Sequence, residues 1–155
     1  MSIEERCADK GLRMTEQRRT IARVLEDTRD HPDTEELHRR AAALDPRISI
    51  STVYRTLALF EDAGIVERHA FRAPGDFRAP GDKEARAREV RARYEPAPDD
   101  HHDHLIDLKS GRVIEFRDEE IEALQEAVAR RLGYRLVDHR LELYAVPLDR
   151  AETDT

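Results

Sequence analysis

The chain has 155 residues, enough for one ordinary domain or two small ones. Charged residues make up 39% of it and aromatic residues only 5%, and no apolar run approaches the roughly 18 residues that a membrane span requires. This composition excludes a membrane protein. Because the N-terminus is polar and acidic, unlike a signal or transit peptide, we expect a cytoplasmic protein.

The net charge of −7 is unevenly distributed. Residues 1–95 carry 19 basic and 19 acidic side chains, whereas residues 96–155 carry 8 and 15. Such asymmetry predicts two functions, with a neutral part that can present a basic face and an acidic part suited to cations. Cys7 is the single cysteine, which rules out an internal disulfide and a metal cage built of thiolates.

Two helices are expected in the first 46 residues. Thr15 is a suitable N-cap for a helix that runs to about Glu26, and Asp33 and Glu36 have the spacing of a capping box for a second one that Pro46 ends. The expected buried positions are Ile21, Val24 and Leu25 in the first helix and Leu37, Ala41 and Leu44 in the second.

A third helix and a hairpin follow. Ser51 is the expected N-cap of this helix, Val53, Leu57 and Phe60 recur on one face, and Gly64 suits a left-handed C-cap. "IVERHAF" (65–71) and "RARYE" (91–95) are expected to pair as strands. Three helices and a two-stranded hairpin predict a winged helix-turn-helix.

A perfect tandem repeat, "FRAPGDFRAPGD" (71–82), separates these two strands. Two copies are too few to stack as a solenoid. We therefore expect a duplication that lengthens the wing loop over about residues 72–93, with an extended basic arm as the alternative.

The C-terminal part has the pattern of a small α/β unit. "HLIDL" and "RVIEF" alternate around the turn "KSG", and Asp118 is the expected cap of a helix with acidic residues first, Arg130 and Arg131 last, and Gly133 beyond. "RLVDHRLELYAV" (135–146) is expected as a final strand. Its expected inner face consists of Val137, His139, Leu141, Leu143 and Ala145. The exposed edges of so small a sheet predict dimerisation by sheet pairing.

Three histidines and three aspartates occur in "DDHHDH" (99–104). In an extended segment, His101 and Asp103 point to one face and His102 and His104 to the other, so one strand would contribute to two sites. Imidazole and carboxylate ligands suit zinc, iron(II) or manganese(II).

Partners for each pair occur elsewhere in the chain. His139 and Glu122 are expected to complete the His101/Asp103 set, and His31 and Glu95 the His102/His104 set. The alternatives are a histidine-rich surface loop that binds metal only adventitiously, and solvated side chains at His31 and Glu122. We expect His38 and His69 to be structural or surface residues. The sequence offers no separate nucleophile or acid–base pair, so we do not expect an enzyme.

Four segments together resemble the ferric uptake regulator family of metal-responsive repressors. They are "GLRMTEQRRTIARVL", "STVYRTLALFEDAGIVERH", "HHDHLIDLKSGRVIEF" and "HRLELYAV", in that order from about residue 10 to 147. The resemblance implies an α+β fold, with an N-terminal winged helix-turn-helix domain followed by a small α/β dimerisation domain. The expected parts are a DNA-binding domain in residues 1–94, a hinge in 95–100, a metal-binding dimerisation domain in 101–148 and a tail in 149–155.

The resemblance also implies roles for particular residues. The regulatory metal site falls on His31, Glu95, His102 and His104, and the second site on His101, Asp103, Glu122 and His139. Arg13, Tyr54 and Arg55 are implied to contact DNA. The implied protein is a cytoplasmic homodimer that represses iron-uptake genes at an inverted-repeat operator in double-stranded DNA, with Fe²⁺ as the expected corepressor and Mn²⁺ or Zn²⁺ able to occupy the sites. A manganese-responsive regulator and a metal-buffering protein without an operator are the alternatives.

The sequence departs from the family pattern at two places. Many members bind a structural zinc through a CxxC pair after the histidine cluster, whereas Asp107 and Ser110 occupy these positions here. We therefore expect no cysteine-bound zinc and no membership of the peroxide-sensing branch, which depends on it. The second departure is the lengthened wing.

Overall fold

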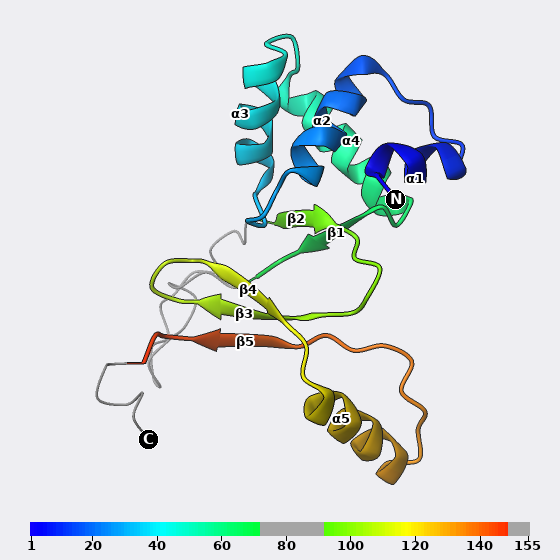
Figure 1. The fold of residues 1–155 in the computed structure, drawn as a ribbon, viewed down its shortest axis with the longest axis vertical. Helices are drawn as coiled ribbons and strands as arrows, with labels where there is room; N and C mark the ends of the chain where they lie inside the picture. The colour runs from blue at the N-terminus through cyan, green and yellow to red at the C-terminus, as the bar shows by residue number, and fades with distance from the viewer. Residues whose placement is uncertain (72–91, 149–155) are drawn as a thin grey trace, which may run out of the picture. The chain divides into compact units, whose positions relative to one another are not determined.

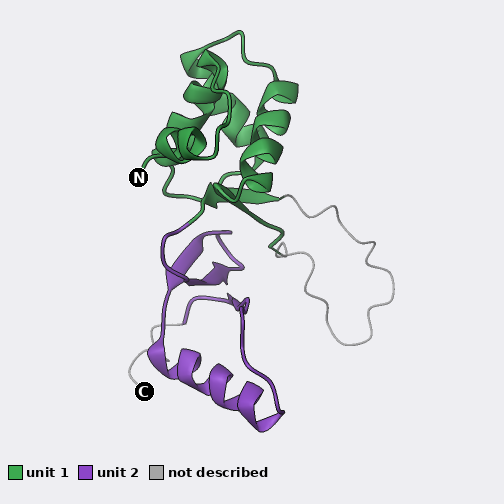
Figure 2. Ribbon diagram, turned by 90° about the vertical axis from the view of Figure 1, so that its right-hand side faces the viewer, with its two compact units in different colours: residues 1–97 green, residues 98–155 purple. Residues whose placement is uncertain are grey.

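The computed structural model describes residues 1–71 and 92–148 and divides the chain into two compact units, residues 1–97 and residues 98–155 (Figure 2). Each unit is described by itself. Residues 72–91 of the expected wing insertion and the expected tail lie outside the described residues, whereas Arg93, expected at the end of the insertion, begins a strand because it pairs with His69. No helix within residues 1–71 or 92–148 combines the length and the apolar character needed to cross a membrane.

Unit 1 contains four helices: α1 (Ile3–Asp9), α2 (Glu16–Glu26), α3 (Thr34–Leu44) and α4 (Ile50–Asp62) (Figure 1). The first was not predicted from the sequence. Ser2 begins it with a capping box, in which its side chain accepts from the backbone N–H of Glu5 while the Glu5 carboxylate accepts from that of Ser2. The motif satisfies two backbone donors that the first turn leaves unpaired.

The other N-caps confirm two predictions and correct one. Thr15 caps α2, and Asp33 caps α3 by accepting from the backbone N–H of Glu36. Ser49, and not Ser51, caps α4, because its Oγ accepts from the backbone N–H of Thr52. The helix therefore begins one residue before the expected cap.

The wing is a two-stranded antiparallel ribbon of β1 (Val66–His69) and β2 (Arg93–Pro96). Gly64 precedes it with a φ of 69°, in the left-handed region that favours glycine, and this ends α4 as predicted. An isolated bridge joins Asp33 to Arg93, and the backbone N–H of Tyr94 donates to the carbonyl of Pro32. These bonds hold the loop before α3 against β2.

One hydrophobic core joins all of these elements. The predicted stripes of the helices are buried in it, with the exception of Leu44, the last residue of α3, which is 67% exposed. Cys7 of α1 is fully buried in the same core. Its members are Ile3, Cys7, Ile21, Ala22, Val24, Leu25, Leu37, Ala41, Ile48, Val53, Leu57, Phe60, Ile65, Val66 and Tyr94.

Unit 2 contains a three-stranded sheet and one helix, α5 (Glu119–Arg131), which lies between the second and third of these strands in the chain. The central strand is β3 (Asp103–Asp107), which pairs antiparallel with β4 (Val113–Phe116) and parallel with β5 (Glu142–Ala145). Asp118 caps α5 as predicted, and Gly133 after it has a φ of 88°.

The final strand is shorter than predicted. Only Glu142–Ala145 pairs with β3, and Val137, expected on the inner face, is 85% exposed. Leu141, just before β5, accepts one backbone hydrogen bond from the N–H of His104, and residues 135–140 pair with no strand that the structure describes. Ile106 is the one hydrophobic residue classed as buried among the described residues of unit 2, and α5 contains no buried residue.

Candidate metal centres

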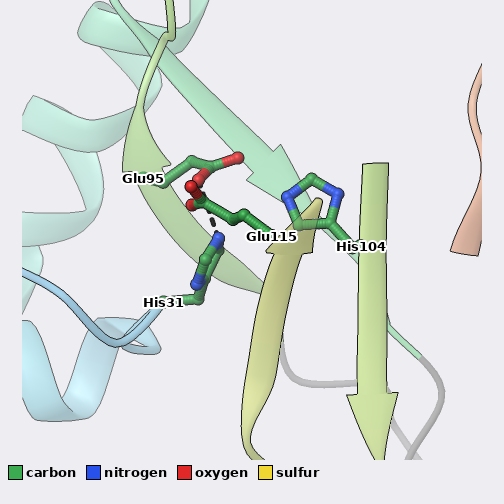
Figure 3. Close-up of side chains that lie close together, drawn as sticks. All are labelled: His31, Glu95, His104 and Glu115. Atoms are coloured by element: carbon green, nitrogen blue, oxygen red, sulfur yellow. Dashed lines mark ion pairs between the residues drawn. The ribbon is translucent and has the colours of Figure 1, made fainter. Parts of the chain in front are cut away.

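The first candidate centre contains a buried histidine–glutamate pair in unit 1. His31 lies in the loop before α3 and Glu95 on β2, and the His31 Nε2 is 2.7 Å from the Glu95 Oε2 (Figure 3). Both residues are about 5% exposed or less. The bonds between the loop and β2 explain how two residues 64 positions apart meet. The pair offers one imidazole and one carboxylate.

A second histidine approaches the same carboxylate. The His69 Nε2 of β1 is 2.6 Å from the Glu95 Oε1 and 3.5 Å from a carboxylate oxygen of Glu67. His69 is 5% exposed, so the structure makes it a buried residue of the centre and not a surface one. We expected only a structural or surface role for His69 and did not predict its contact with Glu95. The antiparallel register, which sets Glu67 opposite Glu95, is the signal that leads to it.

His102 and His104 of the histidine cluster lie in unit 2. The rings of His102 and His104 are 4.9 Å apart, centroid to centroid. The register of the β3–β4 hairpin places Glu115 directly opposite His104, and both side chains are drawn in Figure 3. A Glu115 oxygen is 3.6 Å from the His102 Nε2. Unit 2 therefore gathers two imidazoles and a carboxylate.

Glu115 was missed by the sequence reasoning. The signal for it was the turn "KSG", since a hairpin around residues 109–111 brings β4 back along β3 and sets its carboxylate beside the histidines.

A different cluster lies wholly within unit 2. The side chains of His101, Asp103, Glu122 and His139 each direct one ligand atom to a common point, with all four atoms within 4.8 Å of one another. The Nε2 atoms of His101 and His139 are 2.9 Å apart, and both lie close to the Asp103 Oδ1, at 3.1 and 3.2 Å. Asp103 is 1% exposed, and no donor among the described residues bonds its Oδ2.

These atoms suit a divalent metal. Four ligands about 2.1 Å from a tetrahedral ion lie about 3.4 Å from one another. The separations that involve His101 or His139, from 2.9 Å between the two imidazoles to 4.0 Å between His101 and Glu122, bracket that value. Two imidazoles and two carboxylates are ligands common to zinc, iron(II) and manganese(II).

The turn at the position of the family's CxxC pair is closed by hydrogen bonds. The Asp107 carboxylate accepts from the Ser110 Oγ at 2.7 Å and from the backbone N–H of Lys109 at 2.8 Å. These two bonds, the one from Ser110 first, lower the pKa of Asp107 below its ordinary value. Gly111, with a φ of 75°, donates its N–H to the Asp107 carbonyl and completes the turn.

The residues expected to contact DNA are solvent-accessible. Tyr54 is 53% exposed, and Arg55 beside it is also exposed, on the first turns of α4. Tyr54 therefore does not pack into the core of unit 1. Arg13 is exposed before α2, where its carbonyl accepts from the Arg18 guanidinium.

Comparisons with known proteins agree with this architecture. The model of the ferric uptake regulator family matches residues 9–80 and 83–144. The chain belongs to this family. It is therefore a metal-responsive transcriptional regulator that binds divalent metal.

Individual members of the ferric uptake regulator family are similar over nearly the whole chain. The "Ferric uptake regulation protein" of Rhizobium leguminosarum bv. viciae is 60% identical over 97% of this chain and 95% of its own length. A solved structure of a "zinc-bound manganese uptake regulator" is 60% identical, with a TM-score of 0.74 over 96% of this chain and all of that one. The ferric uptake regulator of Vibrio cholerae is 36% identical, with a TM-score of 0.72 over 91% of this chain and 96% of its own.

Proposed function

We propose that this regulator is a homodimeric, metal-dependent repressor in which one metal ion joins its two units. The observation that carries the proposal is the division of ligands between the units. His31 and Glu95 form a buried pair in unit 1, and His102, His104 and Glu115 gather in unit 2. Neither half alone offers the four or more ligands that a tightly bound transition metal takes.

The chain length permits the two halves to share an ion. Glu95 and His102 are seven residues apart, so their backbones can be separated by at most about 25 Å and are free to come much closer. An ion bound by both halves stabilises only those arrangements of the units in which the ligands converge. Since a ligand shifts an equilibrium only by its differential affinity for two states, this site is suited to act as the switch.

The cluster of His101, Asp103, Glu122 and His139 has a different proposed role. All four of its ligands belong to unit 2, so an ion bound there stiffens that unit without selecting its position relative to unit 1. We assign to it the stability of the dimerisation domain, whose own hydrophobic core is small.

The winged-helix unit is proposed to read DNA through α4. Recognition helices of this kind lie in the major groove with their N-terminal residues on the bases. Tyr54 can pack its ring on a thymine methyl and Arg55 can bind a base edge or a phosphate, while Arg13 is suited to a phosphate or the minor groove. Two such units in a dimer fit an inverted repeat whose half-sites lie about 34 Å apart.

A second copy of the chain is the proposed partner of unit 2. Leu124, Val128, Leu132 and Tyr134 of the α5 region are exposed by 38% to 74%, an apolar surface that a single copy leaves in water. We place the dimer in the cytoplasm, where promoter DNA and reduced iron are both available, and assign it no catalytic activity.

Iron(II) is the proposed corepressor, as the name of the Rhizobium relative suggests, and manganese(II) is the second candidate. The observation that favours manganese is the 60% identity with a protein named a manganese uptake regulator. Both ions accept the imidazole and carboxylate ligands gathered here.

The test is a selection of promoter fragments by the full-length protein under anaerobic conditions, with Fe²⁺ or Mn²⁺ buffered at matched free concentrations. A common inverted repeat retained only with metal, and lost with Tyr54→Ala or Arg55→Ala, is the expected result. If the DNA fragments are retained at a lower free concentration of Mn²⁺ than of Fe²⁺, manganese and not iron is the preferred corepressor. No metal-dependent retention of any fragment would contradict the repressor and leave a metal-buffering protein.

A further inference from the structure

His69 is a buried titratable residue to which the proposed switch gives no role. It lies on β1, two residues after Glu67, and the register sets Glu67 directly opposite Glu95 on β2. Like charges at such opposed positions repel each other. The His69 Nε2, at 2.6 Å from Glu95 and 3.5 Å from Glu67, lies between the two carboxylates.

The direction of this hydrogen bond follows from the chemistry of its partners. An ionised carboxylate only accepts, so the His69 Nε2 carries the proton and donates it to the Glu95 Oε1. The other oxygen, Oε2, is then the one directed to His31, at 2.7 Å. One carboxylate thus has one oxygen on each of two buried imidazoles.

The ring of His69 is held in this position by Phe71. The two rings are stacked, with centroids 4.9 Å apart and planes 6° from parallel, and Phe71 is 5% exposed. A ring packed in this way has little freedom to turn, so its N–H fixes the orientation of the carboxylate that it contacts. Hydrogen bonds of this kind to metal ligands orient them and alter their affinity for the ion.

We propose that His69 is a positioning residue of the switch: its Nε2–H holds the Glu95 Oε1, so that the Oε2 alone is presented to a metal bound by His31. The inference rests on the function proposed for His31 and Glu95. Without His69, the Glu95 carboxylate loses the hydrogen bond that orients its Oε1 and is repelled by Glu67, and the site loses its preset geometry.

The experiment compares His69→Leu, which removes the donor, with His69→Gln, whose side-chain amide can donate from nearly the same place. His38→Leu is the matched control, because the His38 Nε2 bonds a backbone carbonyl, that of Ile48, elsewhere in unit 1. Each full-length variant also carries His139→Ala, which weakens the separate cluster in unit 2. Co²⁺ is titrated anaerobically, and its visible absorption reports both affinity and coordination.

His69→Leu is expected to weaken Co²⁺ binding about 10- to 100-fold and to change the absorption spectrum. His69→Gln should remain within a few-fold of the parent with the parent's spectrum, and His38→Leu should match it too. Melting curves and size measurements establish that each variant is folded.

Three results would overturn the inference. If His31→Ala abolishes Co²⁺ binding but His69→Leu binds as the parent does, the positioning role is wrong while the switch site stands. If His69→Gln loses as much affinity as His69→Leu, His69 acts as a ligand or through its packing and not as a donor. If His31→Ala binds Co²⁺ as the parent does, the proposed site itself fails and the inference fails with it.

Discussion

Cys7 is a core residue and not part of a metal site. It is fully buried among the apolar side chains of unit 1, and this burial raises the pKa of its thiol, which keeps the thiol protonated and unreactive. The structure thus explains why a chain with two histidine-rich centres can carry a lone cysteine.

We expect Cys7→Ser to lower the free energy of unfolding by about 1–3 kcal/mol, because it places a hydroxyl without an assured partner in the core. Cys7→Ala, which introduces no polar group, is the control and should cost less. Urea unfolding measures the stability, and elemental analysis measures the metal content, which should be the same in all three proteins. Loss of one metal equivalent per chain in either variant would show that the thiol is a ligand.

Asp107 stabilises the turn that replaces the family's cysteine pair, and its contribution depends on pH. Its pKa is lowered in the folded protein by the bonds from Ser110 and Lys109. A lowered pKa means that the stabilisation is present above the unfolded value of about 4 and disappears as the pH falls through the folded value.

Asp107→Asn is therefore expected to melt at a lower temperature than the parent near pH 7, with the gap closing below about pH 4. Ser110→Ala removes the same hydrogen bond without removing the charge, and its deficit should shrink over the same pH range. Melting temperatures from pH 3 to 7 provide the measurement. If the melting temperature of Asp107→Asn lies equally far below that of the parent at pH 3 and at pH 7, the ionised Asp107 carboxylate does not stabilise the turn.

At the scale of secondary structure, Ser49 and Ser51 have different roles at the start of α4. Ser49 caps the helix, whereas Ser51 lies exposed within its first turn. Ser49→Ala should lower the stability by about 1 kcal/mol, as loss of a cap does, and Ser51→Ala should be nearly neutral. Thermal or urea unfolding of the two variants decides between them. Equal costs, or a larger cost for Ser51→Ala, would move the helix start to the residue expected from the sequence.

Local signals were sufficient for most of unit 1. Thr15 and Asp33 predict helices because each is a capping residue followed by an apolar stripe. Gly64 predicts the end of α4 because the residue after the C-cap adopts a positive φ, which glycine allows. The cap of α4 was placed wrongly at Ser51 because Ser49 and Ser51 both precede the apolar stripe that begins at Val53. Only the backbone geometry shows which of the two serines is the cap. The helix at Ile3–Asp9 has just one turn of apolar character, Ile3 and Cys7, and is stabilised by tertiary packing.

Local sequence signals were weaker where the structure depends on strand pairing or on contacts between residues far apart in the chain. Alternation predicts a long last strand, yet among the described residues the strand that pairs with β3 is limited to Glu142–Ala145. The same alternation separates His101 and Asp103 from His102 and His104, and the structure brings Glu122 and His139 to the first pair. Glu115 and His69 could be found only through strand register, which depends on which residues face each other across two strands.

The whole molecule combines two units whose hydrophobic cores differ in size. Unit 1 has a continuous core, and unit 2 leaves much of its apolar surface exposed. This difference is what a dimerisation domain would require, since its core is completed by the second copy and, in our proposal, by the metal bound to His101, Asp103, Glu122 and His139.

The central claim is that the ion between the units, and not the ion within unit 2, controls DNA binding. The most direct measurement is operator affinity as a function of free metal concentration for the parent, His31→Ala and His139→Ala, with His38→Ala as a control in unit 1. We predict that His31→Ala remains a folded dimer but loses all stimulation by metal. His139→Ala should melt at a lower temperature yet keep its metal response, and His38→Ala should keep it unchanged. A full metal response in His31→Ala together with its loss in His139→Ala would contradict the account.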